Sequence, residues 1–219
     1  MKKYFYILGW LLCFGLTFSQ TQTKKIQDDQ SVTILKSIQE KLKKIKSAGI
    51  KFSLQTEKDN KTLSTIKGNV SVKGDKYKLI LPSQHVYCDS VNVWSYLPDQ
   101  NEVTISYYDS QDDENAINPI KLITNYHKYY RSAFIRETSE KGITIQIIDL
   151  YPLQAATFFK IRIIINKNKQ EILKISISER DGYTYTYSFD SFIKNPTIND
   201  SVFVFNPSQY QGIEIIDMR

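Results

Sequence analysis

The chain has 219 residues, a length that suits one ordinary domain. Its 29 basic and 23 acidic residues leave a formal net charge of +6, a modest excess that is compatible with a nearby anionic membrane surface but is not evidence for one. Only two short runs concentrate charge, KLKKIK at 41–46 and SQDDEN at 110–115. We interpret the first as the solvated face of a helix and the second as a surface loop.

The first 20 residues, MKKYFYILGWLLCFGLTFSQ, have the pattern of a secretory signal peptide. Lys2 and Lys3 precede an apolar run that is short for a membrane span, and a polar stretch follows it. We therefore expect the mature chain to begin near Thr21, to be soluble and exported, and to form a single domain over 21–219. Removal of the two lysines lowers the formal charge to +4, and export argues against a nucleic-acid partner.

The two cysteines bear on a possible lipid anchor. Cys13 would be the acylated residue of a bacterial lipoprotein, but a lipobox has a small residue before its cysteine and Leu12 stands there instead. We therefore expect no lipid on the chain. Cys88 is then the one cysteine of the mature protein, which excludes an intramolecular disulfide. Its surroundings indicate a small strand residue rather than a nucleophile.

Residues 31–47, SVTILKSIQEKLKKIKS, predict an amphipathic helix. Leu35, Ile38 and Leu42 fall on one stripe, and the lysines lie on the other side. From Gly49 onward the hydrophobic period changes to two, which is typical of β-strands. Turn residues separate six candidate strands, at 49–56, 63–73, 76–81, 85–89, 92–97 and 102–108.

A second helix is predicted from Asn118 and Pro119, a cap residue followed by a first-turn proline. Leu122, Ile123 and Tyr126 belong to its apolar and aromatic stripe, which continues to about residue 131. Strands are then expected at 142–150, 158–166, 171–179, 183–193, 202–206 and 213–217. The elements show no β-α-β alternation, so the sequence predicts a mainly β fold with helices, built on one large antiparallel sheet.

The alternation also predicts the buried face of this sheet, most clearly in YTYTYSF at 183–189, where rings alternate with hydroxyl residues. So wide a sheet normally curls, and two helices cover too little of it unless the sheet wraps around them. We therefore expect a helical plug and a hydrophobic cavity. A fully packed core is the alternative that pattern alone favours. The expected lining residues are Val70, Val72, Tyr77, Leu79, Trp94, Tyr96, Val103, Ile105, Ile145, Ile147, Tyr183, Tyr185, Tyr187 and Phe189.

Motifs for catalysis or metal binding are not evident in the sequence. His85 and His127 are its two histidines and lie far apart, without Cys-x-x-Cys or His-Glu-x-x-His spacing. A Gly-x-Ser-x-Gly elbow and a glycine-rich phosphate loop are also missing. Glu179 and Asp181 are better explained as a charged hairpin turn than as the acid pair of a glycosidase. We expect a protein that is not an enzyme and that needs no metal or cofactor.

Five segments, taken in order, carry a resemblance to a known family. They are ILKSIQEKLKKIKSAGIKFSLQ, GNVSVKGDKYKLIL, CDSVNVWSYLPDQNEVTI, NPIKLIT and FVFNPSQYQGIEIID. They correspond to an opening helix that runs into a strand, a Gly-led hairpin, a Trp-x-Tyr-x-Pro segment, a second helix, and a closing Phe-x-Phe-x-Pro stretch. Together they resemble the LolA family, the periplasmic carriers of outer-membrane lipoproteins, across nearly all of the mature chain.

The resemblance implies an unclosed β-barrel with a helical lid over a hydrophobic cavity that accepts the acyl chains of lipoproteins. Each methylene buried is worth about 0.8 kcal/mol, so acyl chains need a shield in water. The resemblance also implies a Gram-negative-type periplasmic location, an inner-membrane lipoprotein-releasing ABC transporter as donor, and an outer-membrane acceptor. The implied lid residues are Leu35, Ile38, Leu42, Leu122, Ile123 and Tyr126.

One departure from the family lies in the first hairpin, where members carry an Arg-Pro pair linked to cargo hand-over. The corresponding stretch here is Val72-Lys73-Gly74-Asp75. Lys73 is therefore the hand-over candidate, although an ammonium lacks the planar fork of a guanidinium. Three alternatives stay open: a carrier of other lipids, a membrane-tethered acceptor of the same fold, and a secreted β-sheet module that binds protein or glycan.

Overall fold

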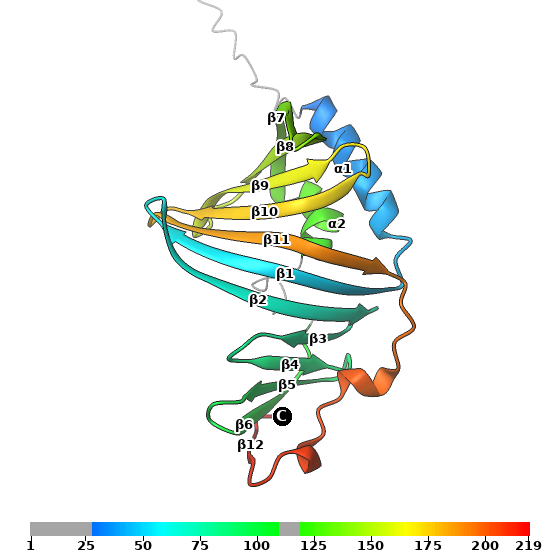
Figure 1. The fold of residues 1–219 in the computed structure, drawn as a ribbon, viewed down its shortest axis with the longest axis vertical. Helices are drawn as coiled ribbons and strands as arrows, with labels where there is room; N and C mark the ends of the chain where they lie inside the picture. The colour runs from blue at the N-terminus through cyan, green and yellow to red at the C-terminus, as the bar shows by residue number, and fades with distance from the viewer. Residues whose placement is uncertain (1–27, 110–118) are drawn as a thin grey trace, which may run out of the picture.

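The computed structural model describes residues 28–109 and 119–219. The expected signal peptide, the mature start near Thr21 and Cys13 lie outside the described residues. Within them the chain forms a twelve-stranded sheet accompanied by two α-helices (Figure 1). The sheet order is β12-β6-β5-β4-β3-β2-β1-β11-β10-β9-β8-β7. The predicted mainly β fold with a large unclosed antiparallel sheet is confirmed.

The elements have the following bounds. The helices are α1 (Asp29–Leu42) and α2 (Pro119–Tyr129), with the short 3₁₀ helices η2 (Asp200–Phe203) and η3 (Pro207–Gln209). The strands are β1 (Ser47–Lys58), β2 (Lys61–Lys73), β3 (Lys76–Ile80), β4 (His85–Cys88), β5 (Asn92–Leu97), β6 (Glu102–Tyr107), β7 (Tyr130–Glu140), β8 (Ile143–Pro152), β9 (Phe158–Asn166), β10 (Glu171–Glu179), β11 (Tyr183–Lys194) and β12 (Glu214–Asp217).

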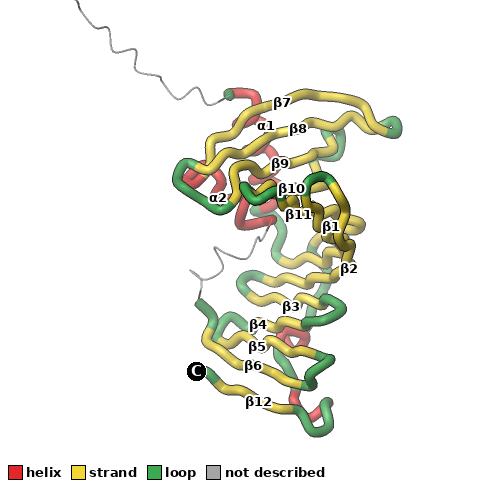
Figure 2. Tube along the Cα trace, turned by 90° about the vertical axis from the view of Figure 1, so that its left-hand side faces the viewer, coloured by secondary structure: helices red, strands yellow, loops and turns green. Residues whose placement is uncertain are grey.

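The sheet has two free edges, β7 and β12, which do not pair with each other. Neighbouring strands run antiparallel except β12, which lies parallel to β6. Strands β7 to β11 bend over the two helices, as the second view shows (Figure 2). This end of the sheet therefore buries apolar surface against α1 and α2.

Helix α1 begins at a capped turn, since the Asp28 side chain accepts a hydrogen bond from the Gln30 backbone N–H at 3.1 Å. Its apolar stripe faces the sheet, and Leu35 and Ile38 are fully buried. The helix ends at Leu42, earlier than the sequence pattern suggested. Ile45 therefore lies in the short connection between α1 and β1.

Two elements differ from the sequence-based expectation. Strand β7 was not predicted because it is an edge strand whose side chains are mostly exposed, with Ser132 its buried exception. Residues 202–206 do not form the expected strand. They contain the end of η2 and an extended stretch in which Phe203 and Phe205 are buried. Alternating burial over so short a segment imitates a strand, but no strand of the described sheet pairs with it.

The sheet carries one hydrophobic cluster on each of its faces. We call the face that α1 and α2 contact the inner face. A row of cross-strand partners traces it from Ile175 through Tyr187 and Leu54 to Ile66. The same register continues from Val70 through Leu79, Val86 and Ser95 to Thr104. Trp94, Tyr96, Val103 and Ile105 alternate with these residues, so they lie on the outer face, where Phe205 covers them.

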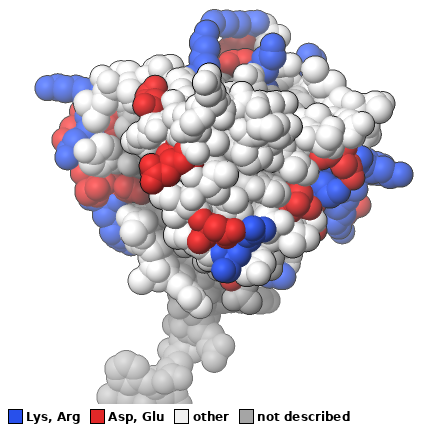
Figure 3. All heavy atoms as spheres, turned by 90° about the horizontal axis from the view of Figure 1, so that it is seen from below, with Lys and Arg blue, Asp and Glu red and all other residues white. Residues whose placement is uncertain are grey.

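Charged side chains at the β12 edge include Asp217 and Arg219, which form an ion pair of 2.6 Å. Seen from that end, the molecule is largely free of charged side chains near its centre, and most lysines and arginines lie toward the margins (Figure 3). The basic excess is therefore not gathered on this face. Within residues 28–109 and 119–219, neither helix has the length and apolar character that crossing a membrane requires.

Candidate functional site

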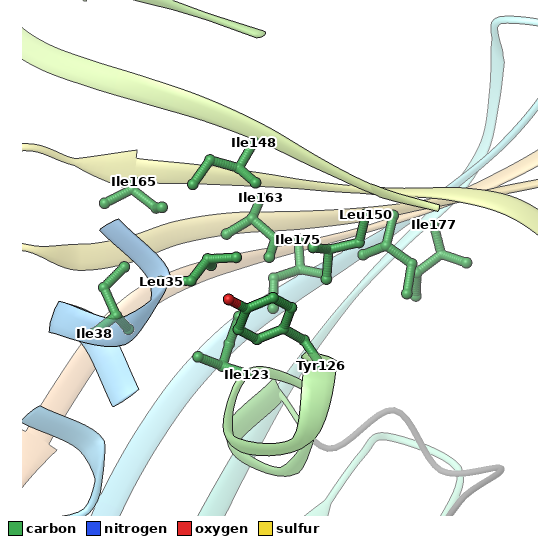
Figure 4. Close-up of a cluster of buried hydrophobic side chains, with 11 residues drawn as sticks. Leu35, Ile38, Ile123, Tyr126, Ile148, Leu150, Ile163, Ile165, Ile175 and Ile177 are labelled. Carbon is green, nitrogen blue, oxygen red and sulfur yellow. The ribbon is translucent and has the colours of Figure 1, made fainter. Parts of the chain in front are cut away.

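The two helices pack on the inner face over β8 to β11. Leu35 and Ile38 of α1, with Ile123 and Tyr126 of α2, point toward the strand residues Ile148, Leu150, Ile163, Ile175 and Ile177 (Figure 4). We call these residues together the helix-covered cluster. Leu42 and Leu122 pack against the same cluster. The structure thus brings all six predicted lid residues onto one patch of the sheet.

Few polar contacts hold α1 in place. The hydroxyls of Ser31 and Ser132 lie 2.7 Å apart where the helix meets β7. Gln39 Nε2 donates to the Ile123 carbonyl of α2 at 2.8 Å, and Lys41 Nζ donates to the Lys169 carbonyl at 2.8 Å. Such single hydrogen bonds contribute about 1 kcal/mol each, so the helix depends mainly on its apolar stripe.

An apolar pocket of about 200 Å³ lies between the C-terminal half of α1 and strands β1, β10 and β11. It adjoins the helix-covered cluster, because Ile38 belongs to both. The apolar part of its wall suits an aliphatic chain, and the polar side chains that also line it can meet water or a polar group. The apolar side chains that line it are Ile38, Leu42, Ile45, Ile50, Ile172, Leu173, Phe189 and Phe192.

Charged side chains also line this pocket. Lys194 and Glu171 join β11 to β10 through an ion pair of 2.7 Å. Lys41 comes from α1 and donates to a neutral carbonyl, as described above. Asp190 accepts a hydrogen bond at 2.8 Å from the Ser53 hydroxyl. An apolar pocket with polar groups of both charges around it can receive an amphiphile.

The rings of YTYTYSF lie on the inner face. Tyr187 and Phe189 pack against the helix-covered cluster, and the ring centroids of Phe52 and Tyr187 are 6.1 Å apart. Burial raises the pKa of the Tyr187 hydroxyl. Tyr183 and Tyr185 stack on each other farther along the strand, with centroids also 6.1 Å apart. The rings of this segment therefore face the helices' side of the sheet, and Phe189 reaches the pocket.

The expectation that all fourteen predicted lining residues share one face requires correction. Val70, Val72, Tyr77 and Leu79 share the inner face with the four rings. Six others lie on the outer face, because a period of two tells which residues of one strand share a face but not which face it is. Those six are Trp94, Tyr96, Val103, Ile105, Ile145 and Ile147.

Most pocket residues were missed from the sequence. Ile45 was visible as a continuation of the α1 stripe, but Ile50, Ile172 and Phe192 carried no distinct signal. Phe192 reaches the inner face through a β-bulge, since Ile50 pairs with Phe192 whereas Phe52 pairs with Phe189. The bulge inserts one residue and so reverses the alternation that YTYTYSF establishes.

Lys73, the hand-over candidate, is bound to the C-terminal segment. Its Nζ donates to Asp200 Oδ1 at 2.6 Å and to the Ile198 carbonyl at 3.1 Å, while Lys76 Nζ lies 2.7 Å from Asp200 Oδ2. The hydrogen bonds from Lys73 and Lys76 lower the pKa of Asp200 to about 2. In this conformation Lys73 joins the β2–β3 turn to η2.

Among residues 28–109 and 119–219, no group of three or more His, Cys, Asp and Glu side chains is placed to hold a metal ion. His85 packs against Tyr96 with centroids 5.7 Å apart. Desolvation, with a contribution from Lys78, lowers the pKa of His85. His127 contacts the ring of Tyr126 on α2. The two histidines thus belong to separate parts of the fold.

Comparison with known proteins gives a consistent result. The family model described as outer membrane lipoprotein carrier protein LolA matches residues 43–206. An uncharacterized conserved protein from Thermus thermophilus has a similar structure, with a TM-score of 0.56 and 11% identity over 86% of this chain and 99% of that one. The lipoprotein LppX from Mycobacterium tuberculosis has a TM-score of 0.50 and 12% identity over 78% and 98%. No curated protein matches this chain in sequence.

Proposed function

Because the chain belongs to the LolA family, described as outer-membrane lipoprotein carriers, we propose that it binds the acyl chains of lipoproteins and ferries them from the inner toward the outer membrane. The observation that carries this proposal is the apolar pocket beneath α1, which adjoins the helix-covered cluster. The protein acts as a periplasmic carrier and not as an enzyme. Its donor is the inner-membrane lipoprotein-releasing ABC transporter, and its acceptor lies at the outer membrane.

Reversible binding follows from the chemistry of the lid. In the closed form the stripe of α1 and α2 covers the isoleucine-rich strands, so an incoming acyl chain exchanges one apolar contact for another. Each acyl methylene gains about 0.8 kcal/mol on leaving water, whereas displaced lid residues lose a comparable amount. The net affinity is therefore moderate, which lets the cargo leave again.

Helix α1 is the element that moves most easily in this scheme. Residues 43–46 connect it to β1, and a handful of hydrogen bonds fix it to β7, α2 and the β9–β10 turn. Cargo entry at the pocket requires only the C-terminal half of the helix to lift. The contact between Ser31 and Ser132 can then persist during binding.

Binding of a fluorescent fatty-acid probe tests the proposal. The probe should bind the folded protein and be displaced by an acylated lipopeptide but not by the same peptide without its acyl chains. Ile45→Asn places a polar amide in the pocket wall and should weaken binding. Ile193→Asn is the matched control, because Ile193 is 57% exposed on the outer face.

Failure of any acyl probe to bind the folded protein would reject the carrier and favour an interaction module with a packed core. Binding of the probe without displacement by the lipopeptide would favour a carrier of other lipids. Mass spectrometry of molecules that copurify with the protein from its native periplasm separates these cases. Release of an acylated lipoprotein from membrane vesicles that contain the ABC transporter tests the donor step.

A further inference from the structure

Exposed apolar side chains gather around the connection between β8 and β9. Leu153 begins this connection and is 40% exposed, Phe159 lies just beyond it and is 41% exposed, and Tyr129 at the end of α2 is 49% exposed. The Leu153 backbone N–H donates to the Tyr129 carbonyl at 2.9 Å, so α2 ends beside the connection. We call Tyr129 and residues 153–159 the β8–β9 rim. Apolar surface residues scattered singly need no explanation, but three around one connection indicate a binding surface.

We propose that the β8–β9 rim docks on an anionic lipid bilayer surface. The inference goes beyond the proposed function, because it concerns a different part of the molecule. The rim lies at the start of β9, whereas the pocket residues Gln170 and Glu171 follow the end of that strand. Docking through the rim therefore leaves the pocket open.

Half-buried rings support the exposed side chains of the rim. The ring centroid of Tyr130 lies 6.5 Å from that of Tyr129 and 6.2 Å from that of Phe158. Tyr130 and Phe158 also pack against the helix-covered cluster. The exposed residues thus stand on a packed base, and the rim can enter a bilayer interface without rearrangement of the sheet. Aromatic rings with a polar tip suit such an interface, because one end is apolar and the other stays in water.

Positive side chains lie next to these rings. Lys128 directly precedes Tyr129 and is exposed. Lys160 Nζ lies 5.7 Å from the ring centroid of Phe159, so its aliphatic stem extends the apolar surface while its ammonium stays in water. Arg180 adjoins the rim, since its backbone N–H donates to the Thr157 carbonyl at 3.2 Å.

The charge balance around the rim is positive. Among the residues that the structure describes, the cations here are Lys128, Arg131, Lys160 and Arg180, and the acids are Glu179 and Asp181. Asp149 and Arg162 lie nearby and neutralise each other at 2.7 Å. The β1–β2 turn adjoins the β10–β11 turn and adds no net charge, because Lys58 and Lys61 balance Glu57 and Asp59. A bilayer offers phosphates to the excess cations and an apolar layer to the rings.

Co-sedimentation with lipid vesicles tests the proposal. The protein should bind vesicles made of phosphatidylcholine and phosphatidylglycerol in equal parts more tightly than vesicles of phosphatidylcholine alone, and added salt should reduce the difference. Lys128→Gln and Lys160→Gln should each weaken binding to the mixed vesicles about fivefold. Leu153→Ser should weaken it about tenfold, because it removes apolar surface.

Two matched variants serve as controls. Lys67→Gln removes an exposed lysine on β2, which lies four strands from β9 in the sheet order. Ile193→Ser removes an apolar side chain that is 57% exposed near the end of β11. Both controls should bind the mixed vesicles as the unaltered protein does.

A tryptophan placed in the rim reports insertion directly. The emission of Tyr129→Trp should be quenched by mixed vesicles whose lipids carry brominated acyl chains. Trp94 of the unaltered protein lies on the outer face of β5 and should keep its emission.

The outcomes are independent of the pocket. If the protein binds neither kind of vesicle, binds both equally, or binds the mixed vesicles equally well in the rim variants and the controls, the proposal is overturned. Binding to native membranes but not to vesicles of pure lipid also overturns it and favours a protein partner. The assay uses protein without cargo, so failure of docking leaves the acyl-probe result unchanged, and failure of the acyl probe leaves docking unchanged.

Discussion

The ring of Phe52 lies directly over Gly68, its cross-strand partner on β2. A Cβ atom at residue 68 would lie 2.5 Å from Phe52 Cζ and 2.7 Å from Leu81 Cδ2. Phe52 is 8% exposed, and its buried ring fills the space on the inner face that a side chain at residue 68 would need. Glycine weakens a strand, but here it allows a ring to approach the neighbouring backbone.

Gly68→Ala should therefore lower the free energy of unfolding by about 1–3 kcal/mol, measured by denaturant titration, because the added methyl overpacks the site. Phe52→Leu in the same chain should recover part of the loss, giving a favourable coupling energy in a double-mutant cycle. Gly49→Ala is the control, since its nearest neighbour, Ile193 Cβ, is 4.0 Å away. Equal effects of the two alanines would contradict the contact.

The two central tyrosines of YTYTYSF should respond differently to truncation. Tyr187→Ala should cost about 3 kcal/mol of stability, because Tyr187 packs on the helix-covered cluster beside Phe52. Tyr185→Ala should cost less, since Tyr185 stacks on Tyr183 nearer the β10–β11 turn. Tyr185 lines neither the pocket nor the helix-covered cluster, so a loss of probe binding in Tyr185→Ala would extend the cargo path along β11 toward Tyr183.

Thr186→Ala is the control for both tyrosine changes. It removes a hydrogen bond of 3.0 Å to Ser176 on the outer face and should cost about 1 kcal/mol without affecting the probe. Denaturant unfolding and probe binding on all three variants decide the question. Equal losses of stability at 185 and 187, with normal binding, would assign both rings to the core.

The C-terminal segment around η2 should be held less firmly to the β2–β3 turn at acid pH. The hydrogen bonds from Lys73 and Lys76 lower the pKa of Asp200 to about 2, whereas an unfolded aspartate titrates near about 3.9. The stabilisation is therefore complete above the unfolded pKa and is lost as pH falls from about 4 through about 2. The protection factors of the amides around η2, which are the exchange rates corrected for the intrinsic effect of pH, should fall over this range.

Asp200→Asn should give low protection factors around η2 throughout this pH range, without the acid-dependent fall. Asp217→Asn is the comparison, because Arg219 lowers the pKa of Asp217 to about 2 at β12 rather than at η2. If the protection factors around η2 still fell in acid in Asp200→Asn, the ion pairs of Asp200 would not be what attaches the C-terminal segment.

The pair of Asp149 and Arg162 on the outer face should be costly to break. Arg162 Nε and Nη2 donate to the two carboxylate oxygens at 2.7 and 2.8 Å, and Asp149 is 1% exposed. Asp149→Ala should destabilise by about 3 kcal/mol, because it leaves a partly buried guanidinium unpaired. Glu137→Ala breaks the exposed pair with Lys167 and removes an acceptor of the Gln146 amide, and it should cost clearly less than Asp149→Ala.

Asp149→Leu combined with Arg162→Met separates the cost of an orphaned charge from the value of the pair. This double variant should unfold closer to the unaltered protein than Asp149→Ala does. If it is the less stable of the two, the ion pair itself stabilises the sheet.

Hydrophobic periodicity predicted the sheet, both helices and the lid stripe, because local spacing determines these features. It did not predict which face of β5 and β6 is continuous with the face that the helices cover. Trp94 and Tyr96 are covered by Phe205, a residue far along the chain, and no local pattern records that contact. The pocket could not be predicted from local patterns either. A β-bulge turns Phe192 toward it, and its lining residues come from four separate elements.

The position of β12 has a consequence for the order of folding. Residue 214 pairs with residue 102, so the last strand of the chain adds to a hairpin made long before it. Closing so long a loop is slow, and β6 keeps an unpaired edge until the chain end arrives. The aromatic outer face of β4 to β6 also stays exposed to solvent until then, because Phe205, which covers it, lies just before β12 in the chain. We therefore expect the end of the sheet farthest from the helices to fold last. Removal of β12 would leave the backbone edge of β6 unpaired and able to pair with another chain.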